Sequence, residues 1–506
     1  MRAPMTTKRG RVSFVGAGPG DPRLLTLRGK ELLETASIVV YEEGVHPETL
    51  ARAKSATAIA KPRNASPESV ADELVKFARE GHHVARVFVG DPFAFRGGTV
   101  ELARVRAAGV AGEVVAGVIA PTAAAVYTGL ALNRATDVTP SIALAVVQEA
   151  AQLHDWTKLS LATDTLALVV HFDQVEEITS TLTYYGRPPE TPAALVRDVS
   201  LPSQRVVLDT LVGVRRHAAS FGGGHGLLFV GDSLSERNLL RWFDERPLFG
   251  KRVLVPRAEG QSGTTADLLR ARGAEPVLVP TIAFVAPDDR GPLDEALDRL
   301  ARGEYGVCVL TSENGVRALF DAMHARGLDA RAFGRAKIAV VGPGTKAALA
   351  SHGVRADVMA KEFRGEGLAA AILEAVGVAR PRVLVARARE AREILPDTLR
   401  SKGLTVDVVP VYVTVPVAGV GDRVRSLLSG EGGGLDAVLL TSASTADRFA
   451  DALGGESLPP GVLVASIGPV TSEAIKKRGL PVHVEAPEAT VAALIDALEA
   501  AQVDER

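Results

Sequence analysis

The amino-acid sequence predicts an α/β protein with two successive halves, an N-terminal half of two subdomains and a C-terminal half of two lobes. Short apolar runs alternate with amphipathic stretches along most of the chain, which favours a largely parallel sheet whose strands are connected by helices. The length of 506 residues is too great for a single core, so about three or four domains are expected. Finally, residues 251–505 contain an internal repeat, which indicates a duplicated α/β unit.

The composition excludes several classes of protein. Hydrophobic residues make up 46% of the chain and charged residues 23%, as in ordinary globular proteins. The net charge of −2 offers no basic surface for nucleic acid, and no apolar run reaches membrane-spanning length, so we expect a cytoplasmic protein. The single cysteine, Cys308, lies in an apolar run, which predicts an inert core thiol and no disulfide. The ten histidines show no metal-ligand spacing, so no metal site is expected.

The N-terminal half begins with a strand that enters a glycine loop, residues 11–20 (RVSFVGAGPG). The glycine spacing differs from the G-x-G-x-x-G of a dinucleotide site, and a tight structural turn is the simplest interpretation. A second α/β stretch follows from about residue 141. We expect further strands at 37–41, 83–89, 165–171, 193–199 and 227–231, and helices at 67–79 and 120–129.

Several short motifs follow one another in residues 10–235. They are VGAGPGDP at 15–22, LLT at 24–26, GDPF at 90–93, RGG at 96–98, DW at 155–156, TP at 191–192 and QR at 204–205. In this order they resemble the tetrapyrrole methylases, specifically uroporphyrinogen-III C-methyltransferase. The resemblance implies subdomains at about 10–135 and 140–235, with S-adenosylmethionine between them. The residues expected to contact this cofactor are Pro19, Val89, Gly90, Asp91, Ile119, Ala120 and Ala194.

The same resemblance implies three ionisable residues on the substrate side. Glu42 is the candidate proton acceptor, Lys61 the candidate proton donor, and Arg96 the residue that holds acidic substrate side chains, to which a guanidinium is well suited. Without the resemblance, all three would be interpreted as solvated surface charges. Residues 90–92 would be interpreted as a turn in which Asp91 bonds its own backbone.

This chain departs from the family pattern mainly on the substrate side. Glu42 stands where an aspartate is usual, a glycine before Arg96 is missing, and Thr99 replaces a glutamate. Near the cofactor, Val89 replaces a glycine and Val170 a methionine. The motifs therefore leave open an alternative in which the methylase-like domain is catalytically degenerate.

After a polar connector at about 236–250, the C-terminal half repeats itself at an offset close to 130 residues. In each copy, small hydroxyl residues follow an apolar strand and precede a helix, so that side-chain donors and free backbone N–H groups meet at one edge. Helix N-capping is an alternative interpretation, and it can coexist with ligand binding. The repeated motifs are VLVPRA at 253–258 with VLVARA at 383–388, TSENG at 311–315 with TSAST at 441–445, and GPGT at 342–345 with GPVT at 468–471.

Together with YVT at 412–414, these motifs resemble uroporphyrinogen-III synthase over nearly all of residues 250–500. The resemblance implies two lobes joined by a two-stranded hinge, which the chain crosses near 282–285 and again near 412–416. One lobe would then comprise about 251–283 plus 415–505, and the other about 284–413.

The synthase resemblance also implies the substrate, hydroxymethylbilane, a flexible linear tetrapyrrole with many carboxylates. The reaction would remove a terminal hydroxyl as water, invert ring D and close the macrocycle. Tyr412 is the best candidate for assisting the departure of the hydroxyl, since a phenol can donate a proton; a half-buried aromatic of the hinge is the alternative. The residues expected to bind the substrate are Arg257, Thr311, Ser312, Asn314, Thr345, Arg387, Thr441, Ser442, Ser444 and Thr471.

The leading hypothesis is a bifunctional enzyme that makes uroporphyrinogen III and then methylates it with S-adenosylmethionine to precorrin-2, on a route to sirohaem or cobalamin. The first alternative is a synthase with a degenerate methylase-like domain. The second is a non-catalytic two-lobed tetrapyrrole sensor. The methylase resemblance also implies a possible homodimer, while no nucleic-acid or membrane partner is expected.

Overall fold

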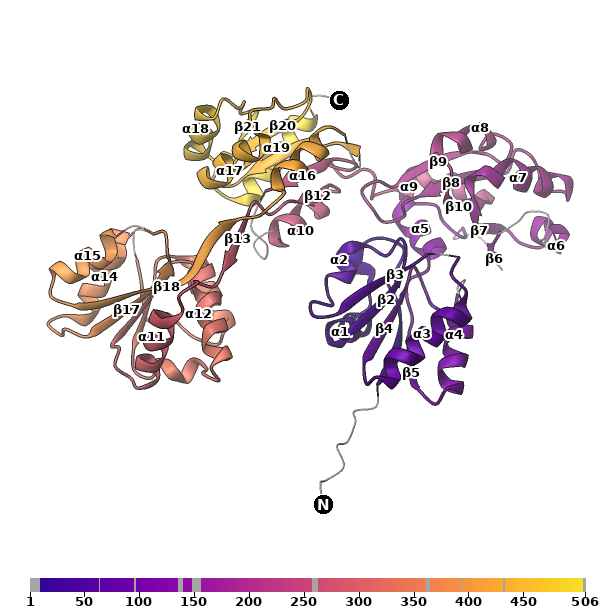
Figure 1. Cartoon of the computed structure of the whole chain (residues 1–506). Coiled ribbons are helices and arrows are strands. Elements are labelled where there is room, and N and C mark those ends of the chain that lie inside the picture. The colour runs from indigo at the N-terminus through magenta and orange to yellow at the C-terminus, as the bar shows by residue number, and fades with distance from the viewer. Residues whose placement is uncertain are drawn as a thin grey trace, which may run out of the picture. The chain divides into compact units, whose positions relative to one another are not determined.

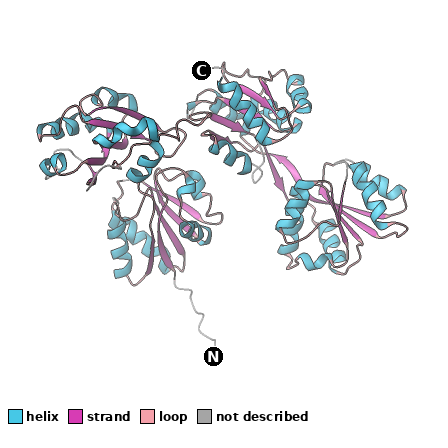
Figure 2. Cartoon of the chain, turned by 180° about the vertical axis from the view of Figure 1, so that it is seen from behind, coloured by secondary structure: helices cyan, strands magenta, loops and turns pink. Residues whose placement is uncertain are grey.

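The computed structural model describes residues 10–62, 64–94, 97–134, 140–147, 156–256, 263–360, 365–391, 393–430 and 433–503. The chain forms two compact units. The first contains the described residues up to Val253 with Asp267–Pro276 and the chain from Leu498, and the second contains the described residues of Leu254–Ala266 and Val277–Ala497. Helices flank the strands of every sheet (Figure 2). In the described part of the chain, no helix is long and apolar enough to span a membrane.

The first sheet is entirely parallel, with the strand order β3-β2-β4-β1-β5. All five strands therefore end at the same edge, where the loops that follow them meet. Phe14, Val40, Leu74 and Phe88 are buried between this sheet and its helices. The elements are β1 (Arg11–Gly16), α1 (Leu27–Thr35), β2 (Ile38–Glu42), α2 (Pro47–Leu50), β3 (Thr57–Lys61), α3 (Pro67–Arg79), β4 (His83–Phe88), α4 (Gly98–Ala107), β5 (Ala111–Val115) and α5 (Ala120–Thr128).

The second sheet is mixed, with the order β6-β7-β10-β8-β9. Only β6 and β7 pair in parallel, whereas β10 is antiparallel to β7 and β8, and β8 is antiparallel to β9. A short loop joins β8 to β9, and such a connection permits only antiparallel pairing. The elements are β6 (Ile142–Val146), α6 (Trp156–Leu161), β7 (Thr165–His171), α7 (Val175–Tyr184), β8 (Pro192–Arg197), β9 (Arg205–Thr210), α8 (Arg215–Ala218) and β10 (His225–Val230).

The connector after β10 packs against α5. It contains a short helix, α9 (Arg237–Leu240), followed by Trp242 and Phe243. The Trp242 indole N–H donates to the Val126 carbonyl over 2.9 Å, and the Phe243 ring lies edge-on to Tyr127 with centroids 4.9 Å apart. These contacts fix the connector to the helix whose first turn lies at the predicted cofactor site.

The third sheet has the order β12-β11-β19-β20-β21. The pairs β19–β20 and β20–β21 are parallel. The elements are β11 (Arg252–Val255), α10 (Gly263–Ala271), β12 (Glu275–Leu278), α16 (Val420–Leu428), β19 (Ala437–Leu440), α17 (Ala443–Leu453), β20 (Leu463–Ser466), α18 (Pro469–Lys477), β21 (Val484–Glu485) and α19 (Val491–Val503).

The fourth sheet has the order β13-β18-β17-β14-β15-β16, and it is parallel except that β13 runs antiparallel to β18. The long strand β18 pairs with β17 through its first part and with β13 through its last part (Figure 1). The elements are β13 (Ile282–Val285), α11 (Gly291–Ala301), β14 (Val307–Leu310), α12 (Glu313–Ala325), β15 (Lys337–Val340), α13 (Pro343–Ser351), β16 (Val358–Met359), α14 (Gly365–Val376), β17 (Arg382–Ala388), α15 (Ile394–Ser401) and β18 (Thr405–Pro416).

Candidate active sites

Three loops meet at the carboxyl edge of the first sheet, and glycines allow them to touch. Gly18 and Gly90 exchange backbone hydrogen bonds of 3.3 and 2.9 Å. A Cβ on Gly117 would lie 2.0 Å from the Gly90 carbonyl oxygen and 2.7 Å from Gly16 Cα, both backbone atoms that cannot move aside cheaply. The close approach therefore requires glycine at this crossing.

The carboxylate of Asp91 ties these loops together. One oxygen accepts from the backbone N–H groups of Phe93 (2.8 Å) and Ala94 (3.0 Å), and the other accepts from the Gly117 N–H (2.9 Å). The first two bonds are the local turn that the sequence offered as the alternative interpretation. The third bond was not predicted, because it joins two loops that follow different strands.

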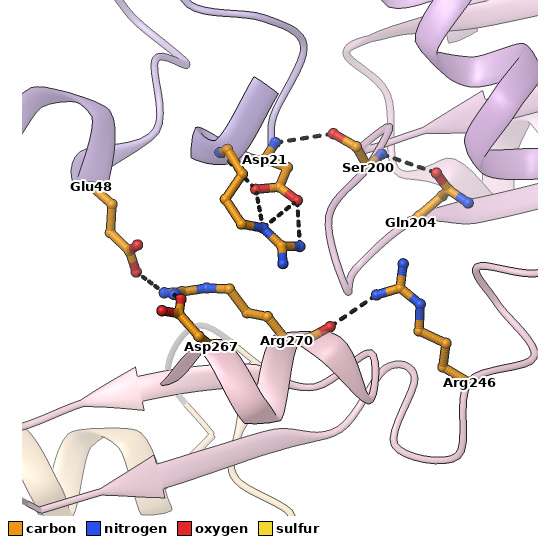
Figure 3. Close-up of polar contacts among 8 residues, drawn as sticks. Asp21, Glu48, Ser200, Gln204, Arg246, Asp267 and Arg270 are labelled. Carbon is orange, nitrogen blue, oxygen red and sulfur yellow. Dashed lines mark hydrogen bonds and ion pairs between the residues drawn. The ribbon is translucent and has the colours of Figure 1, made fainter. Parts of the chain in front are cut away.

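The loop between β8 and β9 also reaches the glycine loop. The Asp21 N–H donates to the Ser200 hydroxyl over 3.0 Å, and the Ser200 N–H donates to the Gln204 side chain over 3.0 Å (Figure 3). Gln204 in turn donates to the Tyr127 carbonyl at the end of α5. Ser200 holds a positive φ of 67°, an uncommon conformation for a residue with a side chain, which these bonds stabilise.

The other predicted cofactor residues lie around the same edge. Pro19 is in the glycine loop and Val89 directly follows β4. Ile119 caps the N-terminus of α5 without a side-chain bond, and Ala120 begins the helix. Ala194, fully buried in β8, belongs to the apolar cluster against which Ala120 packs.

Glu42 and Lys61 are register partners at the ends of β2 and β3. Glu42 is only 5% exposed, so it is not the solvated surface charge that the sequence alone suggested. Its carboxylate accepts from the Val89 N–H over 3.1 Å and lies 3.9 Å from the Arg86 guanidinium. The Lys61 ammonium forms an ion pair with Glu73 of α3. Arg96 lies outside the described residues.

A buried ion pair beside Glu42 was missed by sequence reasoning. The Arg86 guanidinium donates two hydrogen bonds of 2.9 and 3.0 Å to the Glu101 carboxylate, and both side chains are almost fully buried. Burial raises the pKa of Glu101, because it penalises the charged carboxylate. The available signal was Arg86 itself, a charge inside an otherwise apolar strand. Its partner on α4 could not be identified without the tertiary structure.

In the fourth sheet, polar residues gather where β14, β15, β17 and β18 run toward one edge. Thr311 and Ser312 follow β14, Thr345 lies in the first turn of α13, and Arg387 lies near the end of β17. Two cavities open here. One of about 350 Å³ is lined by Ser312, Asn314 and Thr345 among others, and one of about 520 Å³ by Thr311 and Arg387 among others.

Tyr412 joins this polar edge through its hydroxyl. The Tyr412 oxygen lies 3.2 Å from the Ser312 hydroxyl, which also caps α12 by accepting from the Gly315 N–H over 3.0 Å. The Tyr412 ring is 8% exposed and packs edge-to-face on Phe284, with centroids 5.3 Å apart. Tyr412 is thus a packed aromatic residue of β18 whose hydroxyl lies at the polar edge.

The equivalent edge of the third sheet repeats the arrangement. Ser442 caps α17 by accepting from the Thr445 N–H over 3.2 Å, and its hydroxyl lies 3.0 Å from that of Ser444. Thr441 follows β19, and Thr471 is buried in the first turn of α18. The two serine caps show that N-capping and exposure of polar groups at the edge coexist.

Of the two arginines predicted to bind the substrate, only one lies among the residues that the structure describes. Arg387 is buried and forms an ion pair with Glu393, which sequence reasoning missed because the partner lies outside the repeated motifs. Arg257 lies outside the described residues. Within the ranges described above, no group of three or more His, Cys, Asp or Glu side chains could hold a metal ion.

Comparison with known proteins identifies both halves. Residues 11–213 match the family model of the tetrapyrrole (corrin/porphyrin) methylases, and residues 263–496 match that of uroporphyrinogen-III synthase HemD. A porphyrin biosynthesis protein HemD from Ruminiclostridium josui is 33% identical over 97% of this chain and 98% of its own length. The chain therefore belongs to the family in which a tetrapyrrole methylase domain and a uroporphyrinogen-III synthase domain are fused. The predicted fusion and fold class are confirmed.

Other relatives match one half. A sirohaem synthase from Edwardsiella ictaluri is 36% identical over 48% of this chain and 53% of its own length. The crystal structure of a uroporphyrin-III C-methyltransferase from Thermus thermophilus is 34% identical and covers 46% of this chain and 96% of that chain, with a TM-score of 0.39. A uroporphyrinogen III synthase from the same organism is 19% identical and covers 51% of this chain and 100% of that chain, with a TM-score of 0.36.

Proposed function

We propose that the protein converts hydroxymethylbilane to uroporphyrinogen III, with inversion of ring D, and then methylates that product to precorrin-2. The observation that carries the synthase proposal is the hydrogen-bonded pair of Tyr412 and Ser312 at a strand edge rich in hydroxyl groups and N-capped helices. Membership in a family that fuses both enzyme domains supports the pairing of the two reactions.

In the synthase site, the hydroxyl groups and helix N-termini bind carboxylates and hold the linear substrate folded. The bond between the hydroxymethyl carbon and its oxygen breaks as the pyrrole nitrogen supplies electrons, and the Tyr412 phenol donates the proton that completes the leaving water. Ring D then attacks the methylene carbon left by the hydroxyl through its own substituted α-carbon, which forms a spiro intermediate. The original bond from that α-carbon to the methylene of ring C breaks, and that methylene bonds to the free α-carbon of ring D, which loses its proton as the macrocycle closes. The main contribution of the site is orientation, because free bilane closes to the wrong isomer.

The methylase site fits S-adenosylmethionine, which would supply an electrophilic methyl group. Gly90, at a φ of +78°, leaves open space: an added Cβ would have only the Val118 carbonyl oxygen nearby, at 3.9 Å. The backbone of Gly90, Pro19 and Ala120 would hold the cofactor, as would Val89, Asp91, Ile119 and Ala194. A Thermus thermophilus relative was crystallised with S-adenosylhomocysteine, which supports this assignment. Glu42 is the candidate acceptor of the proton lost from the methylated carbon, Lys61 the candidate donor to the macrocycle, and Arg96 the candidate carboxylate ligand.

A second candidate is a synthase whose methylase-like domain no longer catalyses. The observation that favours it is that the proposed catalytic and cofactor-binding groups already have partners within the protein. Glu42 bonds the Val89 backbone, Lys61 pairs with Glu73, and both oxygens of Asp91 bind loop N–H groups. An active site would have to release at least Lys61 from its ion pair when substrate binds.

One assay separates these candidates. Hydroxymethylbilane is generated in situ with the full chain, with and without S-adenosylmethionine, and the products are analysed by chromatography and mass. Type III isomer without cofactor, and a product two methyl groups heavier with it, is the expected result.

The other outcomes are equally decisive. Unmethylated type III isomer in both tubes would establish the synthase with an inert methylase domain. Type I isomer alone would contradict the synthase proposal, and uroporphyrinogen III supplied directly would then test the methylase by itself.

A further inference from the structure

A cavity of about 540 Å³ lies in the unit that contains the fourth sheet, between strands β13 and β18 and helices α11 and α12. This volume is in the range of small-molecule sites, roughly 300–1,000 Å³. Tyr412 and Asn314, which belong to the proposed synthase site, also line this cavity. Its remaining lining has no assigned role.

Two arginines line the cavity, one within α12 and one at the start of α11. Arg317 lies one turn after Asn314 on the same face of α12, and Arg290 is the residue immediately before α11. Among the described residues, neither guanidinium has an ion-pair partner. Asp321 also lines the cavity, one turn beyond Arg317, and makes no ion pair with it.

Neighbouring arginines of the same helices are neutralised, which makes these two distinctive. Arg299 pairs with Glu295 and Asp407, and Arg326 pairs with Asp294 and Asp298. Arg290 is exposed, while Arg317 is half-buried, so the two positive charges face the cavity with different degrees of desolvation.

The rest of the lining is apolar. Phe284, Leu293 and Val411 contribute to it, and Phe284 packs on the Tyr412 ring. An apolar wall next to guanidinium groups suits a flat aromatic ring that bears carboxylate arms. A pyrrole with carboxylate side chains has this combination of properties.

We propose that this cavity receives the terminal pyrrole that carries the hydroxymethyl group, with Arg317 and Arg290 binding its carboxylate arms. This inference rests on the proposed synthase function. It would bring the leaving hydroxyl close to Tyr412, which lines the cavity and whose oxygen lies 3.2 Å from the Ser312 hydroxyl. Arg317 and Arg290 are thus specificity determinants for the substrate.

The test compares Arg317→Gln and Arg290→Gln with Arg335→Gln. Arg335 is an exposed arginine elsewhere in the same unit, with no ion-pair partner in the part of the chain that the structure describes. Two quantities are measured on the full chain: the KM for hydroxymethylbilane and the Kd for uroporphyrin III, a stable porphyrin with carboxylate arms. Arg317→Gln should raise both about tenfold, and the more exposed Arg290→Gln about threefold, with no change in Arg335→Gln. Arg317→Lys keeps the positive charge but loses the planar guanidinium that can bind a carboxylate through two hydrogen bonds. Its KM and Kd should lie between those of the wild type and Arg317→Gln.

Each alternative result is informative. If the wild type makes type III isomer and both glutamine variants keep KM and Kd within twofold of it, the cavity proposal is overturned and the synthase function stands. If the wild type makes only type I isomer, the synthase function fails, and the cavity proposal that rests on it fails with it.

Discussion

The hydroxyl of Tyr412 illustrates how one side chain can combine packing and chemistry. Its ring is held by Phe284, and its oxygen is fixed beside Ser312, which is itself locked by capping α12. As the proposed proton donor, Tyr412 would need no reorganisation when the leaving group departs. We therefore expect the contribution of Tyr412 to catalysis to depend on its hydroxyl oxygen, and not on its ring.

Tyr412→Phe should lower the kcat for type III formation by about tenfold or more, with little change in KM, because the ring contacts remain and only the proton donor is lost. The measurement is the isomer-resolved assay with bilane generated in situ. Tyr305→Phe is the matched control, since Tyr305 bonds Asp407 away from the polar edge. An unchanged kcat in Tyr412→Phe would remove the phenol from the mechanism.

The Arg86–Glu101 pair is the other decisive contact at this scale. Glu101→Ala leaves a buried guanidinium without its bidentate partner, and it should reduce the free energy of unfolding by about 3–5 kcal/mol. Chemical denaturation followed by circular dichroism measures this loss. Glu113→Ala breaks the exposed ion pair with Arg28, and it should leave the midpoint of the denaturation curve almost unchanged. Equal midpoints for the two variants would contradict a stabilising role for the buried pair.

At the scale of elements, the loops at the carboxyl edge of the first sheet are held together by backbone contacts. Gly16, Gly90 and Gly117 touch through main-chain atoms, and Asp91 adds a side-chain bond across the loops. A Cβ on Gly16 or Gly117 would collide with backbone atoms of the crossing, whereas a Cβ on Gly90 would meet open space. The geometry of the proposed cofactor site is therefore set mainly by the absence of side chains at Gly16 and Gly117.

Gly117→Ala should abolish binding of S-adenosylhomocysteine, because its Cβ would push the Gly90 carbonyl away from its present position. Isothermal titration measures this directly. Gly109→Ala is the control: nothing lies within 4 Å of the new Cβ, so the substitution adds only the backbone penalty of a φ of +76°, about 1–2 kcal/mol, and it lies in a different loop. Wild-type affinity in Gly117→Ala would disprove the role of this crossing in binding.

Cys308 lies in strand β14, where burial raises the pKa of its thiol to about 12. An acid whose folded pKa is raised stays protonated until the pH approaches that value, so almost no thiolate forms near neutrality. A thiol reagent at pH 8 should therefore not react with the native protein, and it should titrate one thiol per chain after denaturation. Rapid labelling of the native chain would show that β14 opens in solution.

At the scale of the whole molecule, the two proposed activities reside in separate sheets, each with its own polar edge. If the sites work independently, Gly117→Ala should accumulate unmethylated type III isomer, and Tyr412→Phe should methylate supplied uroporphyrinogen III at the wild-type rate. Both are measured by the mass of the product. A loss of both activities in either variant would indicate that the sites depend on one another.

The sequence by itself determined the fold class, the family and the hydroxyl residues at the strand ends. The alternation of apolar and amphipathic stretches predicted α/β sheets, and the ordered motifs predicted the fused families. The repeated hydroxyl motifs predicted Ser312 and Ser442 at strand ends, because capping and strand termination are local properties of the chain. The assignments of individual site residues and the domain bounds stay predictions.

Only the tertiary structure decided which distant residues meet. The Arg86–Glu101 pair, the Ser200 contact with the glycine loop, the Arg387–Glu393 pair and the Arg290–Arg317 cavity all join separate elements. Their partners follow from strand order and register, and above all from β18, which pairs in parallel with β17 and antiparallel with β13. Such long-range pairing is set by the packing of whole sheets, and no local sequence pattern records it.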